Sequence, residues 1–245
     1  MGWAADKLGS YLARYLTAPV QNYDAFSVIA PEILKRHLIP GDVLLVEGSE
    51  RISVAIKYLT QSTWSHAALY VGSALGVDKP SLIEADLNHG VVAVRLAKYA
   101  SHNTRICRPV GLSPEDRANL IDFAVAHIGD QYDLKNVLDL ARYLVPTPPV
   151  PARWRRNLMA MGSGDPTRAI CSTLIAKAFQ SVGYPILPLL VDGEADTYRA
   201  RHHSLSTPRD FDLSPYFAII KPTIESGFDH QSFNWKIAHE KRVIE

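Results

Sequence analysis

Three residues that together could perform acyl-transfer chemistry stand far apart in this sequence: Cys171, His66 and Glu84. A cysteine becomes a nucleophile when a base takes its proton, and the base needs a polar group to fix its tautomer. Cys171 stands at the predicted start of a helix, where unpaired backbone N–H groups and the positive end of the helix dipole favour a thiolate. A set of this kind would suit a thiol hydrolase that forms an acyl-enzyme.

Each of the three residues also has a purely structural interpretation. Cys171 could be a small buried core residue, and His66 could be a structural histidine at the mouth of a strand. Glu84 stands in an apolar strand, where burying its carboxylate alone would be costly, so we expect it to be paired or kept off the core. If the strands that carry them are neighbours, Glu84 can reach the far ring nitrogen of His66.

The element that must position the cysteine is a helix beginning near Ile170. A spacing of four between apolar residues gives this helix one broad apolar face, through residues 174, 178 and 182. Gly183 can adopt the left-handed conformation that ends a helix, and Pro185 forbids its continuation. The sequence therefore predicts an amphipathic helix that packs against the rest of the domain.

The elements that must position the histidine and the carboxylate are strands. Apolar runs bounded by turn residues predict strands at 43–46, 65–72, 82–86, 91–94, 104–110 and 216–220. Short loops make them mostly antiparallel, and the first, apolar on both faces, should be central. Helices are predicted at 31–37, 51–60 with Ser49 as N-cap, 113–128 and 134–144, and a polar loop is predicted up to about Ser206.

The composition excludes several classes of function. A net charge of +1 implies no basic surface of the size that nucleic acid requires. Two cysteines, Cys107 and Cys171, make a disulfide framework unlikely and a four-sulfur zinc site impossible. Neither a His-Glu-x-x-His motif nor a close cysteine pair occurs, so we expect no metal and no cofactor.

The N-terminal residues predict neither export nor a membrane span. Residues 1–20 contain Asp6, Lys7 and Arg14 and lack the apolar core of a signal peptide. No run of 18 apolar residues occurs, so we expect a cytoplasmic protein. Residues 3–16 do form an amphipathic stripe, which packs on the core or on a partner, or makes peripheral contact with a membrane surface.

The motifs, taken in order, resemble a known family. They are Gly41-Asp42, then 64–72 (WSHAALYVG), 83–85 (IEA) before Gly90-Val91, 131–133 (QYD), 170–175 (ICSTLI) and 207–211 (TPRDF). This order resembles the permuted NlpC-type cysteine hydrolases of the papain-like fold, in particular the YiiX/YebB-like group. The resemblance implies Cys171 as nucleophile, His66 as base and Glu84 as the residue that orients the base.

The same resemblance suggests the residues that would surround the substrate. The backbone N–H of the nucleophile would be an oxyanion donor, and Tyr132, Ser65 and Ser172 are further candidates for binding substrate or an oxyanion. Thr173 stands where many relatives carry glutamate, and the segment 145–164 is longer than expected. Both departures bear on the choice of substrate rather than on the chemistry.

We therefore predict one α+β domain over residues 39–224, with an antiparallel sheet of five to six strands and the nucleophile helix packed against it. Residues 1–38 would be a helical extension, 225–245 a tail, and 145–164 an inserted loop. The substrate would be a small molecule, a peptide or an acyl-bearing compound. Two alternatives stay open: an acyltransferase of the lecithin:retinol acyltransferase type, and a non-catalytic binding module.

The inserted loop carries a prediction of its own. Its prolines exclude a continuous helix or a central strand, yet Trp154, Leu158 and Met159 would be costly to leave in water. Because the loop leads into Cys171, we expect it to lie over the catalytic mouth as a lid or surface-contact element. The alternative is that these side chains pack on the helices of the domain.

Overall fold

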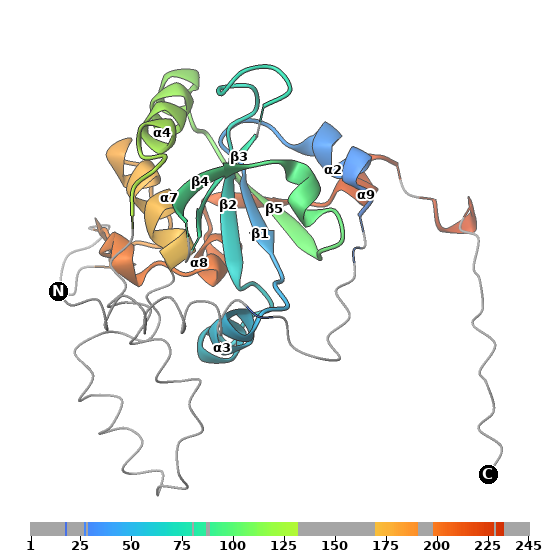
Figure 1. Cartoon of the computed structure of the whole chain (residues 1–245), viewed down its shortest axis with the longest axis horizontal. Coiled ribbons are helices and arrows are strands. Elements are labelled where there is room, and N and C mark those ends of the chain that lie inside the picture. The colour runs from blue at the N-terminus through green and yellow to red at the C-terminus, as the bar shows by residue number, and fades with distance from the viewer. Residues whose placement is uncertain are drawn as a thin grey trace, which may run out of the picture.

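One antiparallel sheet organises the protein (Figure 1). The computed structural model describes residues 29–79, 81–86, 89–131, 170–190, 198–227 and 229–232, together with residues 18 and 27. The strands lie in the order β4 (Gly90–Val94), β3 (Leu82–Asp86), β2 (His66–Tyr70), β1 (Val43–Val46), β5 (Thr104–Pro109) and β8 (Phe217–Ile220). Every neighbouring pair in this sheet is antiparallel, and β1 lies between β2 and β5, as predicted.

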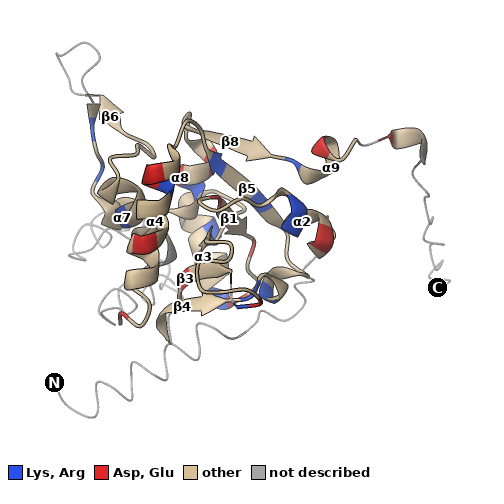
Figure 2. Cartoon of the chain, turned by 90° about the horizontal axis from the view of Figure 1, so that it is seen from above, with Lys and Arg blue, Asp and Glu red and all other residues tan. Residues whose placement is uncertain are grey.

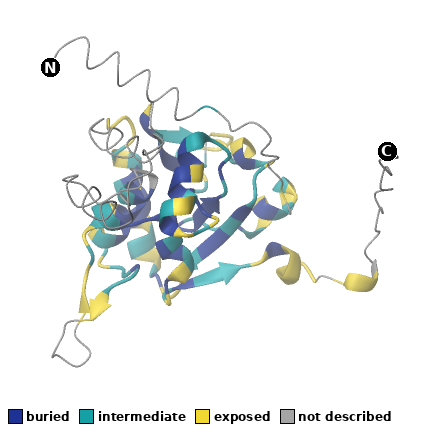
Figure 3. Cartoon of the chain, turned by 90° about the horizontal axis from the view of Figure 1, so that it is seen from below, coloured by how far each residue is buried: buried dark blue, intermediate teal, exposed yellow. Residues whose placement is uncertain are grey.

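The apolar alternation of the strands creates two separate hydrophobic layers, one on each face of the sheet. The first face carries Val43, Leu45, Ala67, Leu69 and Ile83. The second face carries Leu44, Val46, Ala68, Leu82 and Ile106. The four residues of β1 are at most 1% exposed, and burying each such side chain contributes about 1.5–3 kcal/mol. Figure 3 shows the buried residues gathered in the sheet and on the helices beside it.

Three helices cover the first face: α4 (Pro114–Ala126), α7 (Ile170–Ser181) and α8 (Pro208–Leu213). The Ser113 hydroxyl caps α4 by accepting the Asp116 N–H at 3.0 Å, as its sequence predicts. Helix α7 ends before Gly183, which adopts the expected left-handed backbone with φ +67°. In Figure 1, α4 and α7 lie on one side of the strands and α2 on the other.

The second face is covered by α2 (Pro31–His37) and by the 3₁₀ helix η1 (Leu96–Tyr99), with α9 (Pro222–Glu225) beside α2. A buried ion pair fixes the entry to the sheet on this side. The carboxylate of Asp42, which is 0% exposed, accepts two hydrogen bonds from Arg108 at 2.8 and 2.9 Å. Burial raises the pKa of Asp42, and the bonds from Arg108 and from the Ile39 N–H act against that rise.

The helix at 51–60 is present as α3 (Arg51–Thr60), but its predicted cap is wrong. Glu50 is the N-cap residue, in extended backbone, and Ser49 is not. The Glu50 carboxylate instead accepts the Ser53 hydroxyl at 2.8 Å. The helix therefore begins one residue later than a cap at Ser49 would require.

The predicted loop up to about Ser206 contains regular structure. It holds a two-stranded sheet of β6 (Leu189–Leu190) and β7 (Tyr198–Arg199), followed by the 3₁₀ helix η2 (His203–Leu205). A further 3₁₀ helix, η3 (His230–Ser232), lies near the end of the described chain. The stripe at 3–16, the helix at 134–144, the loop at 145–164 and most of the tail lie outside the described residues.

Charges are interleaved over the described helices and strands. Figure 2 shows lysine and arginine scattered among aspartate and glutamate over the described elements, in keeping with the net charge of +1. Among the helices of the described ranges, none is long and apolar enough to cross a bilayer.

Candidate active site

The contact expected between His66 and Glu84 is present. Their side chains meet across β2 and β3, with 3.2 Å between His66 Nε2 and Glu84 Oε2. The pairing of Leu69 with Ile83 sets the register, which puts His66 and Glu84 on the same face as diagonal neighbours. His66 is the first residue of its strand and is 21% exposed at the side chain, whereas Glu84 is fully buried.

Two further groups, both on η1, hold the Glu84 carboxylate. Tyr99 donates its hydroxyl to Oε2, and the Lys98 ammonium donates to Oε1. Burial alone would raise the pKa of Glu84, but the hydrogen bond and charge of His66, with the bonds from Lys98 and Tyr99, lower it to about 2. The carboxylate is therefore ionised at neutral pH although it lies in the interior.

This geometry assigns the ring nitrogens of His66. Because an ionised carboxylate only accepts hydrogen bonds, Nε2 must carry the proton that it shares with Glu84. The role of base then falls to Nδ1. A histidine whose tautomer is fixed in this way is oriented for proton transfer, as a thiol hydrolase requires.

The nucleophile candidate lies on the helix that packs against these two strands. Cys171 is the second residue of α7, and α7 contacts both β2 and β3. The side chain of Cys171 lies outside the described residues, so its predicted contact with His66 stays a prediction.

The faces of the sheet define how such a contact would form. Helix α7 packs on the face of Ala67 and Ile83, while Glu84 and Tyr99 lie on the opposite face. A thiol on α7 must therefore approach His66 around the end of β2. The position of His66 as the first residue of that strand permits such an approach.

The other site candidates fall in different environments. Ser65 is 2% exposed, and its hydroxyl accepts the Gly48 N–H at 2.9 Å, so it braces the loop after β1. Ser172 is fully buried on the first turn of α7, and its predicted role stays a prediction. Tyr132 lies outside the described residues.

A polar cluster that the sequence did not reveal supports the segment before His66. Trp64 donates its indole N–H to Asp212 of α8 at 3.1 Å, and Arg105 donates to the same carboxylate at 2.6 Å. The Arg105 guanidinium also lies 4.8 Å from the centre of the Trp64 ring. Helix α8, through Asp212, thus holds the residue two positions before His66.

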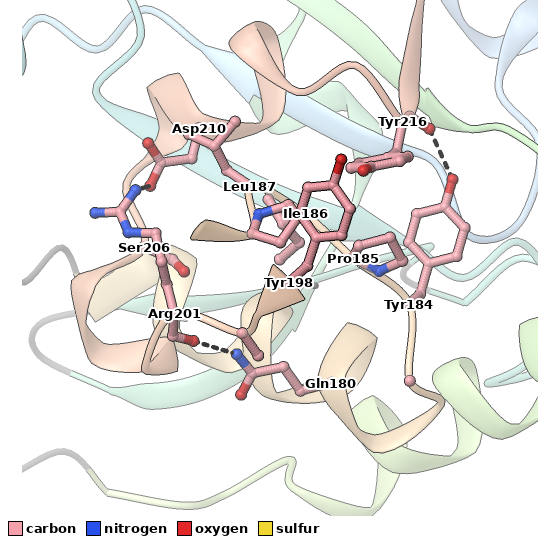
Figure 4. A pocket seen from close by; sticks show the side chains of 13 residues that line it. Gln180, Tyr184, Pro185, Ile186, Leu187, Tyr198, Arg201, Ser206, Asp210 and Tyr216 are labelled. Atoms are coloured by element: carbon pink, nitrogen blue, oxygen red, sulfur yellow. Dashed lines mark hydrogen bonds and ion pairs between the residues drawn. The ribbon is translucent and has the colours of Figure 1, made fainter. Parts of the chain in front are cut away.

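A separate cavity of about 460 Å³ lies beside the C-terminal end of α7 (Figure 4). Tyr184, Tyr198 and Tyr216 line it, and the Arg201–Asp210 ion pair, at 3.5 Å, closes one side. Gln180 also lines this cavity. Residues 171 and 180 are about 14 Å apart along the helix at about 1.5 Å per residue, so the cavity lies away from the helix start that carries Cys171.

The described residues bring together no group of three or more histidine, cysteine, aspartate or glutamate side chains that could hold a metal ion. Cys107 lies on β5 and is fully buried, and burial raises the pKa of its thiol far above the ordinary value. A buried thiol of this kind is inert.

Comparisons with known proteins bear on the fold and on the enzyme class. Residues 37–143 match the family model described as the permuted papain-like amidase enzyme, YaeF/YiiX, C92 family. The probable lipoprotein peptidase YaeF of Escherichia coli (strain K12) is 24% identical over 212 residues, which cover 79% of this chain and 74% of that protein. The crystal structure of metalloprotein yiiX from Escherichia coli O157:H7 aligns with a TM-score of 0.47 and 16% identity, over 74% of this chain and 96% of that chain.

The matched region contains His66 and Glu84 and ends before Cys171. The family description and the named relative support the predicted enzyme class, a cysteine peptidase- or amidase-like hydrolase. The antiparallel sheet with its helices is the predicted α+β fold. Residues 37–143 of this chain are thus similar to the permuted papain-like amidases of the YaeF/YiiX family, in agreement with the YiiX-like resemblance that the motifs indicated.

Proposed function

We propose that the protein is a cysteine amidase in which Cys171 is the nucleophile, His66 the base and Glu84 the residue that orients the base. The observation that carries this proposal is the bond between His66 Nε2 and the buried Glu84 carboxylate at 3.2 Å, on the two strands against which α7 packs. A buried, ionised carboxylate at Nε2 fixes the tautomer that leaves Nδ1 free to act as a base, which is the arrangement a thiol hydrolase uses.

The reaction follows from these groups. His66 Nδ1 takes the thiol proton, and Sγ attacks the carbonyl carbon of the substrate, so that a C–S bond forms. The C–N bond then breaks as the protonated imidazole gives its proton to the leaving amine. His66 then takes a proton from a water molecule, whose oxygen attacks the thioester carbon. The C–S bond breaks, the carboxylic acid leaves, and the imidazolium returns the proton to the Cys171 thiolate.

Glu84 contributes most when His66 carries a positive charge. The fully buried carboxylate attracts the imidazolium more strongly than a solvated one would. The hydrogen bond to Nε2 also prevents the ring from turning. Both effects favour a thiolate–imidazolium pair.

The test uses the full chain with two probes, a fluorogenic peptide amide and a p-nitrophenyl ester. Cys171→Ser and His66→Gln should each reduce kcat/KM by at least about 10³-fold, while Cys107→Ala, the matched control, should retain most of the activity because its thiol is buried. Mass spectrometry of His66→Ala should detect an acyl adduct on Cys171. Full turnover in Cys171→Ser, or an adduct on another residue, would refute the proposal.

The substrate class is a further part of the proposal. The relative named as a probable lipoprotein peptidase makes peptides, with and without an attached acyl group, the first substrates to test. The loop at 145–164 would select the acyl group, so replacing residues 147–160 with a short Gly/Ser linker should reduce activity on long-chain esters more than on short-chain esters. Equal loss on both, with the fold intact by circular dichroism, would show that the loop only packs.

The proposal also covers where in the cell the protein acts. We propose a cytoplasmic enzyme whose stripe at residues 3–16 makes peripheral contact with membranes. Vesicle sedimentation of the chain with and without residues 1–20 tests the membrane contact, and equal sedimentation of the two forms would remove it.

A further inference from the structure

The Glu84 carboxylate receives more donors than the orientation of one histidine requires. Oε2 accepts from both His66 Nε2 and the Tyr99 hydroxyl, and Oε1 accepts from Lys98 Nζ. Tyr99 is 5% exposed, and its ring centre lies 6.0 Å from that of His66. The Lys98 side chain is 45% exposed, so its ammonium contacts both solvent and the buried Glu84 carboxylate.

We propose that Lys98 and Tyr99 are positioning residues for the catalytic histidine: Tyr99 locks the carboxylate against His66, and Lys98 cancels part of its charge so that His66 can release its proton. This inference rests on the proposed function for its catalytic meaning. The contacts that carry it lie wholly among residues that the structure describes.

Tyr99 acts through geometry. A carboxylate held by His66 alone can rotate about its side-chain bonds and lose the bond at Nε2. A second donor to the same oxygen, from a buried phenol fixed against β3, removes that freedom. The ring of His102 packs edge-on against Tyr99 at 5.7 Å between centres and holds the phenol in turn.

Lys98 acts through charge. A buried carboxylate opposite an imidazole raises the affinity of the imidazole for its proton, and an uncompensated one would hold that proton too tightly for a general acid. The Lys98 ammonium on the other carboxylate oxygen opposes this effect. Its charge is screened on its exposed side, so the compensation is partial.

Other charged groups around His66 belong to neighbouring elements. Asp86 lies on β3 and pairs with His89 at 2.8 Å, and Glu47 follows the β1 residue opposite His66 and pairs with Lys57 at 3.4 Å. Both carboxylates thus have their own cationic or histidine partners. Lys98 is the cation bonded to the residue that His66 itself contacts.

The experiment is an NMR titration of the imidazole of His66, with the signal assigned by its absence in His66→Gln. In Lys98→Met the imidazole should titrate about one pH unit higher than in the wild type. Lys98→Arg should titrate near the wild type, and so should Lys79→Met, which removes an exposed lysine elsewhere. The alkaline limb of the kcat/KM profile should move by the same amount.

Tyr99→Phe tests the locking role. This variant should lower kcat about tenfold with little change in KM. A Lys98→Met titration that coincides with the wild type or with Lys79→Met would overturn the role of Lys98, and an unchanged kcat in Tyr99→Phe would overturn that of Tyr99. Because the titration needs no turnover, a shifted His66 signal together with full activity in Cys171→Ser would uphold the charge relation and refute only the proposed function.

Discussion

Replacing Glu84 with glutamine should change how the stability of the protein depends on pH. The carboxylate is fully buried, and its pKa of about 2 lies below the ordinary value of 4.5. A group with a depressed folded-state pKa stabilises the folded protein above its unfolded-state pKa. That stabilisation is lost as the pH falls from about 4.5 towards about 2.

The magnitude follows from the two pKa values. A difference of about 2.5 pH units corresponds to roughly 3 kcal/mol of folding free energy at neutral pH, of which about 2 kcal/mol is lost by pH 3. Glutamine does not titrate, so Glu84→Gln lacks this dependence. The stability gap between the wild type and Glu84→Gln should therefore narrow by about 2 kcal/mol between pH 6 and pH 3.

Urea unfolding followed by circular dichroism at pH 6, 5, 4 and 3 measures this gap. Glu115→Gln, which removes an exposed carboxylate from α4, is the matched control and should give a nearly constant gap. If the gap between wild type and Glu84→Gln also stays constant, Glu84 is not an ionised buried partner of His66. The reasoning about the tautomer of His66 would then be wrong.

Three other predictions follow from particular contacts. Iodoacetamide at neutral pH should label Cys171 much faster than Cys107, which is 0% exposed; equal native-state labelling, read by mass spectrometry, would contradict the assignment of the nucleophile. Asp42→Asn should cost about 3–5 kcal/mol in chemical denaturation because it leaves the arginine partner unpaired, and a cost below about 1 kcal/mol would contradict a buried ion pair. Gly90→Ala should lower the melting temperature more than Gly111→Ala: both have positive φ, but only at position 90 would the added carbon lie 2.1 Å from a backbone oxygen. Equal losses would show that φ alone matters.

The strands and the main helices could be predicted because their signals are local. Predicted segments of four to eight residues located all six strands of the sheet, and Ser113 and Gly183 marked the ends of helices. The prediction of Ser49 as the N-cap of α3 was wrong because the residue types that cap helices are also common in loops. Only the backbone angles decide between Ser49 and Glu50.

Of the hydrogen-bond partners of Glu84, only one could be predicted from the sequence. Its neighbour across the sheet, His66, could be inferred because both residues lie in recognisable strands, 18 positions apart. Lys98 and Tyr99 could not, because η1 is a single turn with no hydrophobic period to place it. The same holds for Asp212, whose bonds to Trp64 and Arg105 join residues more than 100 positions apart.

The sequence located the six strands of the main sheet, the longer described helices and the candidate residues Cys171, His66 and Glu84, since residue types and periodicity are properties of short segments. Tertiary structure alone decided which face of the sheet carries Glu84 and which carries α7, and which donors surround the carboxylate. The physical reason is that a buried charge is stabilised by whichever groups the packed chain brings within hydrogen-bond distance, and those groups come from segments with no sequence relation to one another.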